Sequence, residues 1–254
     1  MKLSRPAAGA LLAFGILFLL GFACKESGSE TSSTDGNVTK SSAANSAPSE
    51  SSSGDLKGIA GNYSVTGTNA NGGGDYTGSM VVTSRGDVYQ FSWDSGGRKY
   101  DGVGVQTDKN VAVAFTDGTD GTGCGVVLYK IGSDGSLDGK AGYWGNNASE
   151  SETATRTKGT DLEGEYKVSG KNVKGNSYSG TLGVQKSGMG YAFTWNTGTT
   201  LKGFGIRQGD KVSVGIGGGQ CGFVAYTVSP DGTLEGKWGS VSSTSVGTET
   251  AKKK

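Results

Sequence analysis

Two aromatic triplets and two cysteines are the residues of this sequence whose types and spacing could serve binding or redox chemistry. The triplets alternate with small or polar residues, so the three rings of each share one face of a predicted strand. They are Tyr89, Phe91 and Trp93, and Tyr191, Phe193 and Trp195. Such rings either line a ligand cavity or fill the core of a small barrel. The core is favoured, because the chain has 48 Gly residues and few other bulky side chains.

Cys124 and Cys221 each begin an apolar segment, and the two segments have similar sequences. An exported chain permits a disulfide between them, which requires Cα atoms within about 7 Å of one another. Alternatively, each cysteine is a small buried apolar residue at the start of a core strand. The sequence leaves both interpretations open.

The composition argues against catalysis, metal binding and nucleic-acid binding. The chain has no His, which removes Ser–His and Cys–His couples and His-ligated metals. With 24 Lys and Arg against 23 Asp and Glu, it offers no basic surface for nucleic acid. Asp-Gly at 134–135 and at 231–232 predicts hairpin turns rather than calcium sites, although Asp138 and Glu235 follow. We therefore predict a protein that is not an enzyme and has no cofactor and no metal, and we interpret its acidic pairs as turn residues.

The segments that position these residues occur twice in the sequence, once in repeat 1 (58–158) and once in repeat 2 (159–254). The motifs G-x-Y-x-V-x-G, Y-x-G, Y-x-F-x-W, C-G-x-V, D-G-x-L-x-G and Glu-Thr-Ala follow in the same order in both. The copies differ in length at the Gly, Asn and Asp clusters 71–74, 95–97 and 116–123. Length changes are tolerated in exposed turns, so these clusters predict turns between strands.

The fold predicted from these segments is all-β, with about eight short strands in each repeat. Short turns between successive strands indicate an antiparallel meander, which can close on itself and so remove its edges. We expect two up-and-down β-barrels in tandem, each an independent unit. Flattened sandwiches or one continuous sheet are the alternatives.

The N-terminus predicts export. Residues 1–23 combine a positive start at Lys2 and Arg5 with a short apolar run, which is typical of a secretory signal. Cys24 follows directly, so the segment resembles a bacterial lipoprotein signal, in which this Cys is acylated and becomes the mature N-terminus. By that resemblance, Lys25 favours the outer membrane. Residues 24–57 are Ser-rich and without aromatic residues, which predicts a disordered tether.

The motif order from G-x-Y-x-V-x-G to the Glu-Thr strand resembles small secreted bacterial proteins often labelled fibronectin-binding protein. The resemblance implies a lipid-anchored binding protein of the cell envelope, a candidate adhesin for a matrix or host protein. The exposed turns would then form the recognition surface. The alternative is a carrier of small apolar ligands with lipocalin-like or avidin-like barrels. An uncharacterised enzyme is a distant third hypothesis.

Overall fold

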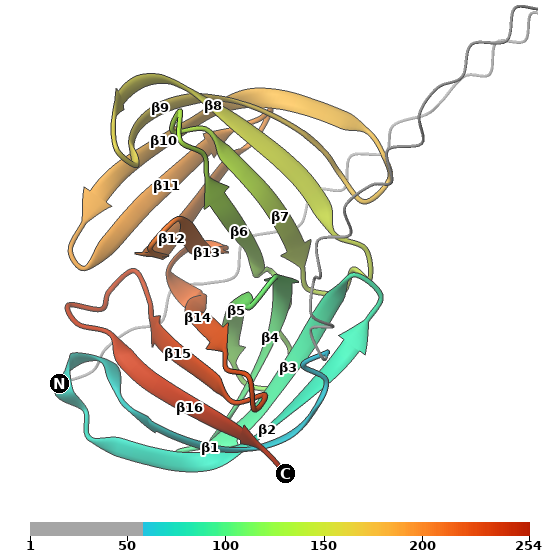
Figure 1. The fold of residues 1–254 in the computed structure, drawn as a ribbon, viewed down its shortest axis with the longest axis vertical. Coiled ribbons are helices and arrows are strands. Elements are labelled where there is room, and N and C mark those ends of the chain that lie inside the picture. Colours follow the sequence, from blue (N-terminus) through green and yellow to red (C-terminus); the bar gives the residue numbers. More distant parts are fainter. Residues whose placement is uncertain (1–57) are drawn as a thin grey trace, which may run out of the picture. The chain divides into compact units, whose positions relative to one another are not determined.

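The computed structural model describes residues 58–254, which form sixteen β-strands and two 3-10 turns, η1 (Ala70–Gly72) and η2 (Gly218–Gln220) (Figure 1). The predicted signal 1–23, the lipidation site Cys24 and the tether 24–57 lie outside the described residues. Within the described part of the chain, no helix has the length and apolar character needed to cross a membrane.

Repeat 1 supplies the first eight strands and repeat 2 the last eight. The strands of repeat 1 are β1 (Gly61–Thr68), β2 (Asp75–Arg85), β3 (Val88–Ser95), β4 (Arg98–Thr107), β5 (Asn110–Asp117), β6 (Gly125–Ile131), β7 (Leu137–Tyr143) and β8 (Glu150–Thr160). The strands of repeat 2 are β9 (Glu163–Lys171), β10 (Ser177–Ser187), β11 (Gly190–Asn196), β12 (Thr200–Gln208), β13 (Lys211–Ile216), β14 (Gly222–Val228), β15 (Leu234–Gly239) and β16 (Gly247–Lys253). The predicted turn at 71–74 falls between strands, as does the cluster at 95–97 apart from its first residue and the cluster at 116–123 apart from its first two.

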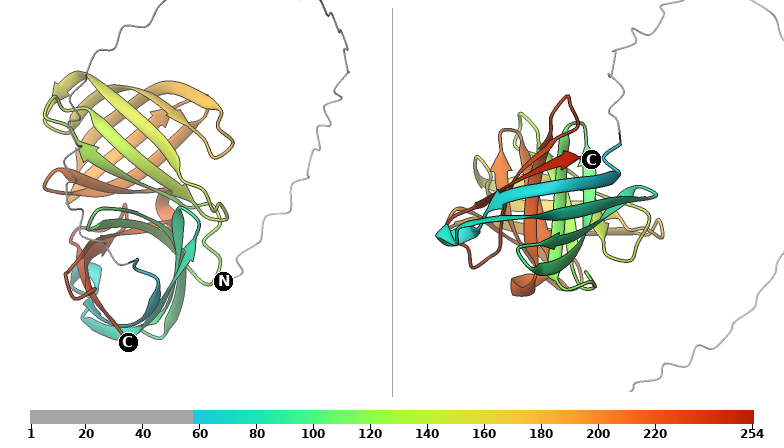
Figure 2. Two further views of the ribbon diagram at one scale, coloured as in Figure 1. Left: turned by 45° about the vertical axis from the view of Figure 1, so that its right-hand side comes forward. Right: turned by 90° about the horizontal axis from the view of Figure 1, so that it is seen from below.

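The strands close into two eight-stranded antiparallel barrels, which confirms the predicted fold class. Barrel 1 has the order β1-β16-β15-β14-β5-β4-β3-β2, and barrel 2 has the order β10-β11-β12-β13-β6-β7-β8-β9. In barrel 1 the first and last strands of the described chain pair side by side, as the blue and red strands in Figure 2 show.

Each barrel combines five strands of one repeat with three strands of the other, so the expectation of one independent barrel per repeat is wrong. The exchange occurs after β5 and after β13. There β5 pairs with β14, and β13 pairs with β6, in place of the next strand of the same repeat. The repeat boundary in the sequence is therefore not a boundary between barrels.

The exchanged strands are buried on both faces, which explains their nearly continuous apolar sequences. In β5, Val111 and Val113 point into barrel 1, whereas Ala112 and Ala114 pack against Val126 of β6. A second shared cluster joins Phe204 and Ile206 of β12 to Phe223 and Ala225 of β14. Burial of these apolar faces holds the two barrels together.

Cys124 and Cys221 form a disulfide in the structure, with Cα atoms 6.0 Å apart. Each cysteine ends the segment that carries the chain from one barrel to the other. Both belong to the apolar cluster shared by β4, β5 and β6. The disulfide therefore joins the two segments that connect the barrels. Its cysteines also pack as buried apolar side chains.

One end of each barrel is closed by the residues that precede its first motif. Ile59 and Leu162 are buried in the barrel cores. The hydroxyl of Tyr63 donates to the Ile59 carbonyl at 2.6 Å, and that of Tyr166 donates to the Leu162 carbonyl at 2.8 Å. The tyrosine of the G-x-Y motif thus holds this apolar plug in place at one end of each barrel.

Candidate ligand-binding sites in the two barrels

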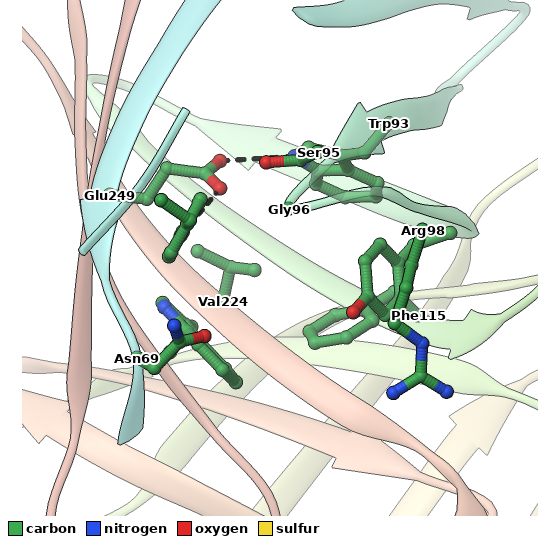
Figure 3. Close-up of a pocket in the computed structure, with 11 residues that line it drawn as sticks. Asn69, Trp93, Ser95, Gly96, Arg98, Phe115, Val224 and Glu249 are labelled. Atoms are coloured by element: carbon green, nitrogen blue, oxygen red, sulfur yellow. Dashed lines mark hydrogen bonds between the residues drawn. The ribbon is translucent and has the colours of Figure 1, made fainter. Parts of the chain in front are cut away.

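Each barrel contains a cavity at the end opposite its plug. The barrel 1 cavity has a volume of about 220 Å³ and is drawn in Figure 3. Its lining residues are Asn69, Tyr76, Trp93, Ser95, Gly96, Arg98, Tyr100, Phe115, Val224, Trp238 and Glu249. The barrel 2 cavity measures about 450 Å³. It is lined by Val127, Tyr129, Ala141, Tyr143, Asn146, Glu150, Glu152, Asn172, Tyr178, Trp195, Thr197, Thr199, Leu201 and Ile216.

A buried carboxylate with three hydrogen-bond donors lies at the base of the barrel 1 cavity. Glu249 is only 6 % exposed. Its Oε1 accepts from the Trp93 indole at 3.0 Å and from the hydroxyl of Tyr226, and its Oε2 accepts from Tyr76 at 2.9 Å. Figure 3 shows Glu249 and Trp93 pointing toward each other, joined by this bond. Four strands, β2, β3, β14 and β16, thus meet at one carboxylate.

Barrel 2 repeats this arrangement with the equivalent residues. Glu152, also 6 % exposed, accepts from the Trp195 indole at 3.0 Å and from the Tyr129 hydroxyl through Oε1. Its Oε2 accepts from Tyr178 at 3.0 Å. We call each set of one glutamate, one tryptophan and two tyrosines the carboxylate cluster of its barrel.

The donors of the carboxylate cluster replace the water that the buried glutamate has lost. Burying a charge without hydrogen bonds is very costly, and the three donors offset that cost. Burial still raises the pKa of Glu249 above its ordinary value of 4.5, although the bonds from Tyr226, Trp93 and Tyr76 act in the opposite direction. Burial, with the charge of Glu249, also raises the pKa of Tyr226 well above its usual range. The tyrosine therefore stays protonated and remains a donor.

The repeated glycines of the first motif make room for one donor of each cluster. A Cβ at Gly67 would lie 2.5 Å from the Tyr76 ring, and one at Gly170 would lie 2.4 Å from the Tyr178 ring. Only glycine lets these tyrosines lie flat on the neighbouring strand and reach the glutamate. The last glycine of G-x-Y-x-V-x-G, Gly67 or Gly170, is therefore needed for the packing of a cluster tyrosine and not for a turn.

Aromatic side chains narrow the cavity of barrel 1 and are absent from the equivalent positions of barrel 2. Phe115 stands at the centre of the barrel 1 group, with ring centroids 5.7 Å from Trp93, 5.8 Å from Tyr100 and 6.3 Å from Trp238. The strand registers place Leu201, Ile216 and Ala141 where barrel 1 has Tyr100, Phe115 and Trp238. These smaller side chains leave barrel 2 with the larger cavity.

One pair of facing residues differs in a coordinated way. In barrel 1, Trp238 faces Gly247, where a Cβ would lie 2.4 Å from the indole nitrogen. In barrel 2 the corresponding pair is Ala141 and Glu150. The small Ala141 makes space for a second carboxylate, which lines the cavity.

The loops around the two cavity mouths also differ in their side-chain hydrogen bonds. The side-chain oxygen of Asn71, in the β1–β2 turn, accepts from the backbone of Thr244 at 2.7 Å and of Ser245 at 3.1 Å. These bonds join the turn to the neighbouring β15–β16 loop at the rim of barrel 1. In barrel 2, the side-chain oxygen of Asn172 accepts, among residues 58–254, from two residues of its own turn, Lys174 and Asn176.

The aromatic triplets divide between core and cavity. Phe91 and Phe193 are buried and stack on the neighbouring tryptophans, with centroids 5.5 and 5.6 Å apart. Trp93 and Trp195 line the cavities. Tyr89 and Tyr191 are half-buried and pack against the barrel cores without lining either cavity.

The sequence interpretation missed the glutamates and tyrosines of the carboxylate clusters. The sequence places the Glu-Thr motif in a strand, and Glu152 lies in β8 and Glu249 in β16, but it gives these glutamates no role in a site. The interpretation of acidic pairs as turn residues is wrong for Glu150 and Glu152, which both lie inside β8. A signal was present, because the Glu-Thr-Ala and Cys-Gly-x-Val motifs place the same Glu and Tyr in both repeats.

The Asp-Gly pairs lie in turns. The Asp134 carboxylate accepts from the Ser136 backbone at 2.9 Å, and that of Asp231 from the Thr233 backbone at 3.0 Å. Among residues 58–254, no group of three or more Cys, Asp or Glu side chains could hold a metal ion.

Comparison with known proteins identifies no matching family model, no matching curated protein and no matching solved structure. The resemblance to proteins labelled fibronectin-binding therefore stays a prediction. The small β-barrel fold is compatible with a binding or carrier role, and the site must be interpreted from its own geometry.

Proposed function

We propose that this protein binds small molecules, with one internal cavity in each barrel and no catalytic step. One observation carries the proposal: each barrel has a cavity that ends at a buried carboxylate held by a tryptophan and two tyrosines. Cavities with apolar walls and a few convergent polar groups are the usual form of ligand sites. The carboxylate would fix the orientation of a ligand that donates hydrogen bonds.

The cavity volumes suit ligands of different size. A cavity of about 150 Å³ is large enough for benzene, so the 220 Å³ of barrel 1 fits a substituted ring. The 450 Å³ of barrel 2 lies within the ordinary range for small-molecule sites, about 300–1,000 Å³. An internal cavity of this kind favours the carrier hypothesis over the adhesin hypothesis, because a protein partner would reach only the exposed turns.

The proposal includes the export route predicted from the sequence. We infer that Cys24 carries lipid and holds the barrels at the cell envelope, in the outer membrane by the resemblance noted above. Metabolic labelling with a fatty acid tests this part separately: the label should be lost in Cys24→Ser, and its retention would contradict lipid attachment there.

Binding is tested with the fragment 52–254, which contains every described strand and the disulfide. Native mass spectrometry should detect bound small molecules after incubation with simple aromatic compounds, and tryptophan fluorescence should change as Trp93 and Trp195 are covered. If neither method detects any compound at millimolar concentration, the proposal is wrong.

A double substitution that fills the cavity of barrel 2 tests which ligands bind in that barrel. Ala141→Trp with Glu150→Gly copies the Trp238–Gly247 pair of barrel 1 and fills the mouth of the larger cavity. We expect this variant to lose the ligand of barrel 2 and to retain that of barrel 1. Asp138→Asn, at an exposed position of the same strand β7, is the control and should bind as the unmodified protein does.

A further inference from the structure

The charges that line the two cavities differ. Within the described residues, the lining of barrel 2 includes Glu150 and Glu152 but no Lys or Arg. Barrel 1 has one carboxylate, Glu249, and Arg98 at its lining. Thr199 occupies the corresponding part of barrel 2, in the β11–β12 turn. The cavity of barrel 2 is therefore acidic, whereas that of barrel 1 has one side chain of each sign.

The two carboxylates of barrel 2 lie on the same face of β8. They are two residues apart, so both side chains point to the interior at a spacing of roughly 7 Å along the strand. Their free hydrogen-bonding capacity is complementary to a donor. Glu152 already has three donors, which leaves one acceptor position on Oε2. Glu150 accepts only from the Val173 backbone, at 3.3 Å, among the described contacts.

Burial, with a contribution from the nearby carboxylates, raises the pKa of two ionisable groups around the cavity. Burial raises the pKa of Glu150, the bond from the Val173 backbone acts in the opposite direction, and the charge of Glu152 adds a smaller upward shift. Burial, followed by the charges of Glu150 and Glu152, raises the pKa of Tyr143 to about 12. A positive charge placed among these three groups would relieve the repulsion between the carboxylates.

We infer that the barrel 2 cavity selects a protonated amine carried on an apolar or aromatic body, an inference that rests on the ligand-binding function proposed above. The ammonium group would lie between Glu150 and Glu152 and donate to both. The apolar body would contact Trp195, Leu201 and Ile216 on the cavity wall. A tryptophan face beside a cation adds further attraction.

The same reasoning gives barrel 1 a different preference. Trp238 and Gly247 occupy the positions that hold Ala141 and Glu150 in barrel 2, so the second carboxylate is missing there. The smaller volume and the five aromatic rings that line it favour a neutral aromatic ligand. The two barrels of one chain would thus bind ligands of different charge.

The test uses two probes of nearly equal size, 2-phenylethylamine and 2-phenylethanol, with the fragment 52–254 at neutral pH. Isothermal titration calorimetry identifies the barrel 2 site as the binding that is lost in the paired variant Ala141→Trp with Glu150→Gly. At that site the affinity for the amine should be about tenfold or more above that for the alcohol. Glu150→Gln keeps the side-chain shape and removes the charge, and it should abolish the preference by weakening the amine alone. Asp138→Asn removes an exposed carboxylate from the same barrel and should leave the preference intact.

The outcomes separate this inference from the proposed function. If the alcohol binds in barrel 2 as tightly as the amine does, or if Glu150→Gln leaves amine binding unchanged, the inferred selectivity is wrong and the binding function stands. If neither probe nor any neutral aromatic compound binds, both are wrong. If Asp138→Asn lowers the amine affinity as much as Glu150→Gln does, the amine is attracted by the overall negative charge of the barrel. That result would also contradict a specific amine site between Glu150 and Glu152.

Discussion

The two barrels share a buried base and differ at the mouth. At the base, Glu249 and Glu152 receive the same three donors with nearly the same distances. At the mouth, barrel 1 has Phe115, Trp238 and Arg98, whereas barrel 2 has smaller side chains and a second glutamate. The comparison teaches that the carboxylate cluster belongs to the shared architecture of the barrel, while the residues above it set the size and charge of the cavity.

The largest expected effect concerns the tryptophans of the two clusters. Trp93→Ala and Trp195→Ala should each lower the free energy of unfolding by about 3–5 kcal/mol, because each removes a buried ring and a donor to the buried carboxylate. The loss should be greater in barrel 1, where Trp93 also contacts Phe115. Urea denaturation followed by circular dichroism measures both. Equal losses below 1 kcal/mol would contradict a structural role for the clusters.

Removing the disulfide tests whether the barrels depend on one another. Cys124→Ala with Cys221→Ala should cost about 2–4 kcal/mol, because the bridge closes a long loop between residues 97 apart in the sequence. Since each barrel contains strands of both repeats, both should lose stability in a single transition. Two separate transitions in differential scanning calorimetry would indicate that the barrels unfold independently.

The pH dependence of the free energy of unfolding tests how strongly burial acts on Glu249 in the carboxylate cluster of barrel 1. Burial raises the pKa of Glu249 in the folded protein above its ordinary value of 4.5. The folded state therefore holds this proton more tightly than the unfolded state, and the stabilisation is complete below pH 4.5 and lost as the pH rises through the folded-state pKa. The free energy of unfolding of the unmodified protein should fall over this range relative to that of Glu249→Gln. Denaturant titrations at pH 4 and pH 7 measure the difference, and a change of the opposite sign would contradict the dominance of burial.

The smallest effect distinguishes the two mouths. Asn71→Ala removes the acceptor that joins the β1–β2 turn to Thr244 and Ser245, at a cost of about 1 kcal/mol. Hydrogen exchange of the Thr244 and Ser245 amides should become faster. Asn172→Ala, in the β9–β10 turn of barrel 2, removes bonds within that turn, so exchange in the β7–β8 loop of barrel 2 should not change. If each variant speeds hydrogen exchange in the neighbouring loop of its own barrel, the two cavity mouths are held together in the same way and the predicted difference is wrong.

Much of the fold was accessible from the sequence because its signals are local. The alternation in Tyr89–Trp93 and the Gly, Asn and Asp clusters locate strands and turns within a few residues. Eight antiparallel strands are enough to close a small barrel, so closure was among the folds that the sequence allowed. The carboxylate clusters were harder to recognise, because Glu249 and Tyr226 come together from separate strands and neither is unusual in its own segment.

The sequence by itself determined the two repeats, their strands and the inward faces of those strands. Only the tertiary structure decided that β5 pairs with β14 and β13 with β6. The physical reason is that the repeats carry nearly the same strands, so exchanged and unexchanged pairings offer similar hydrogen bonds and interior contacts. The choice depends on the apolar outer faces of β4, β5, β6, β12 and β14, which are buried when the two barrels pack together.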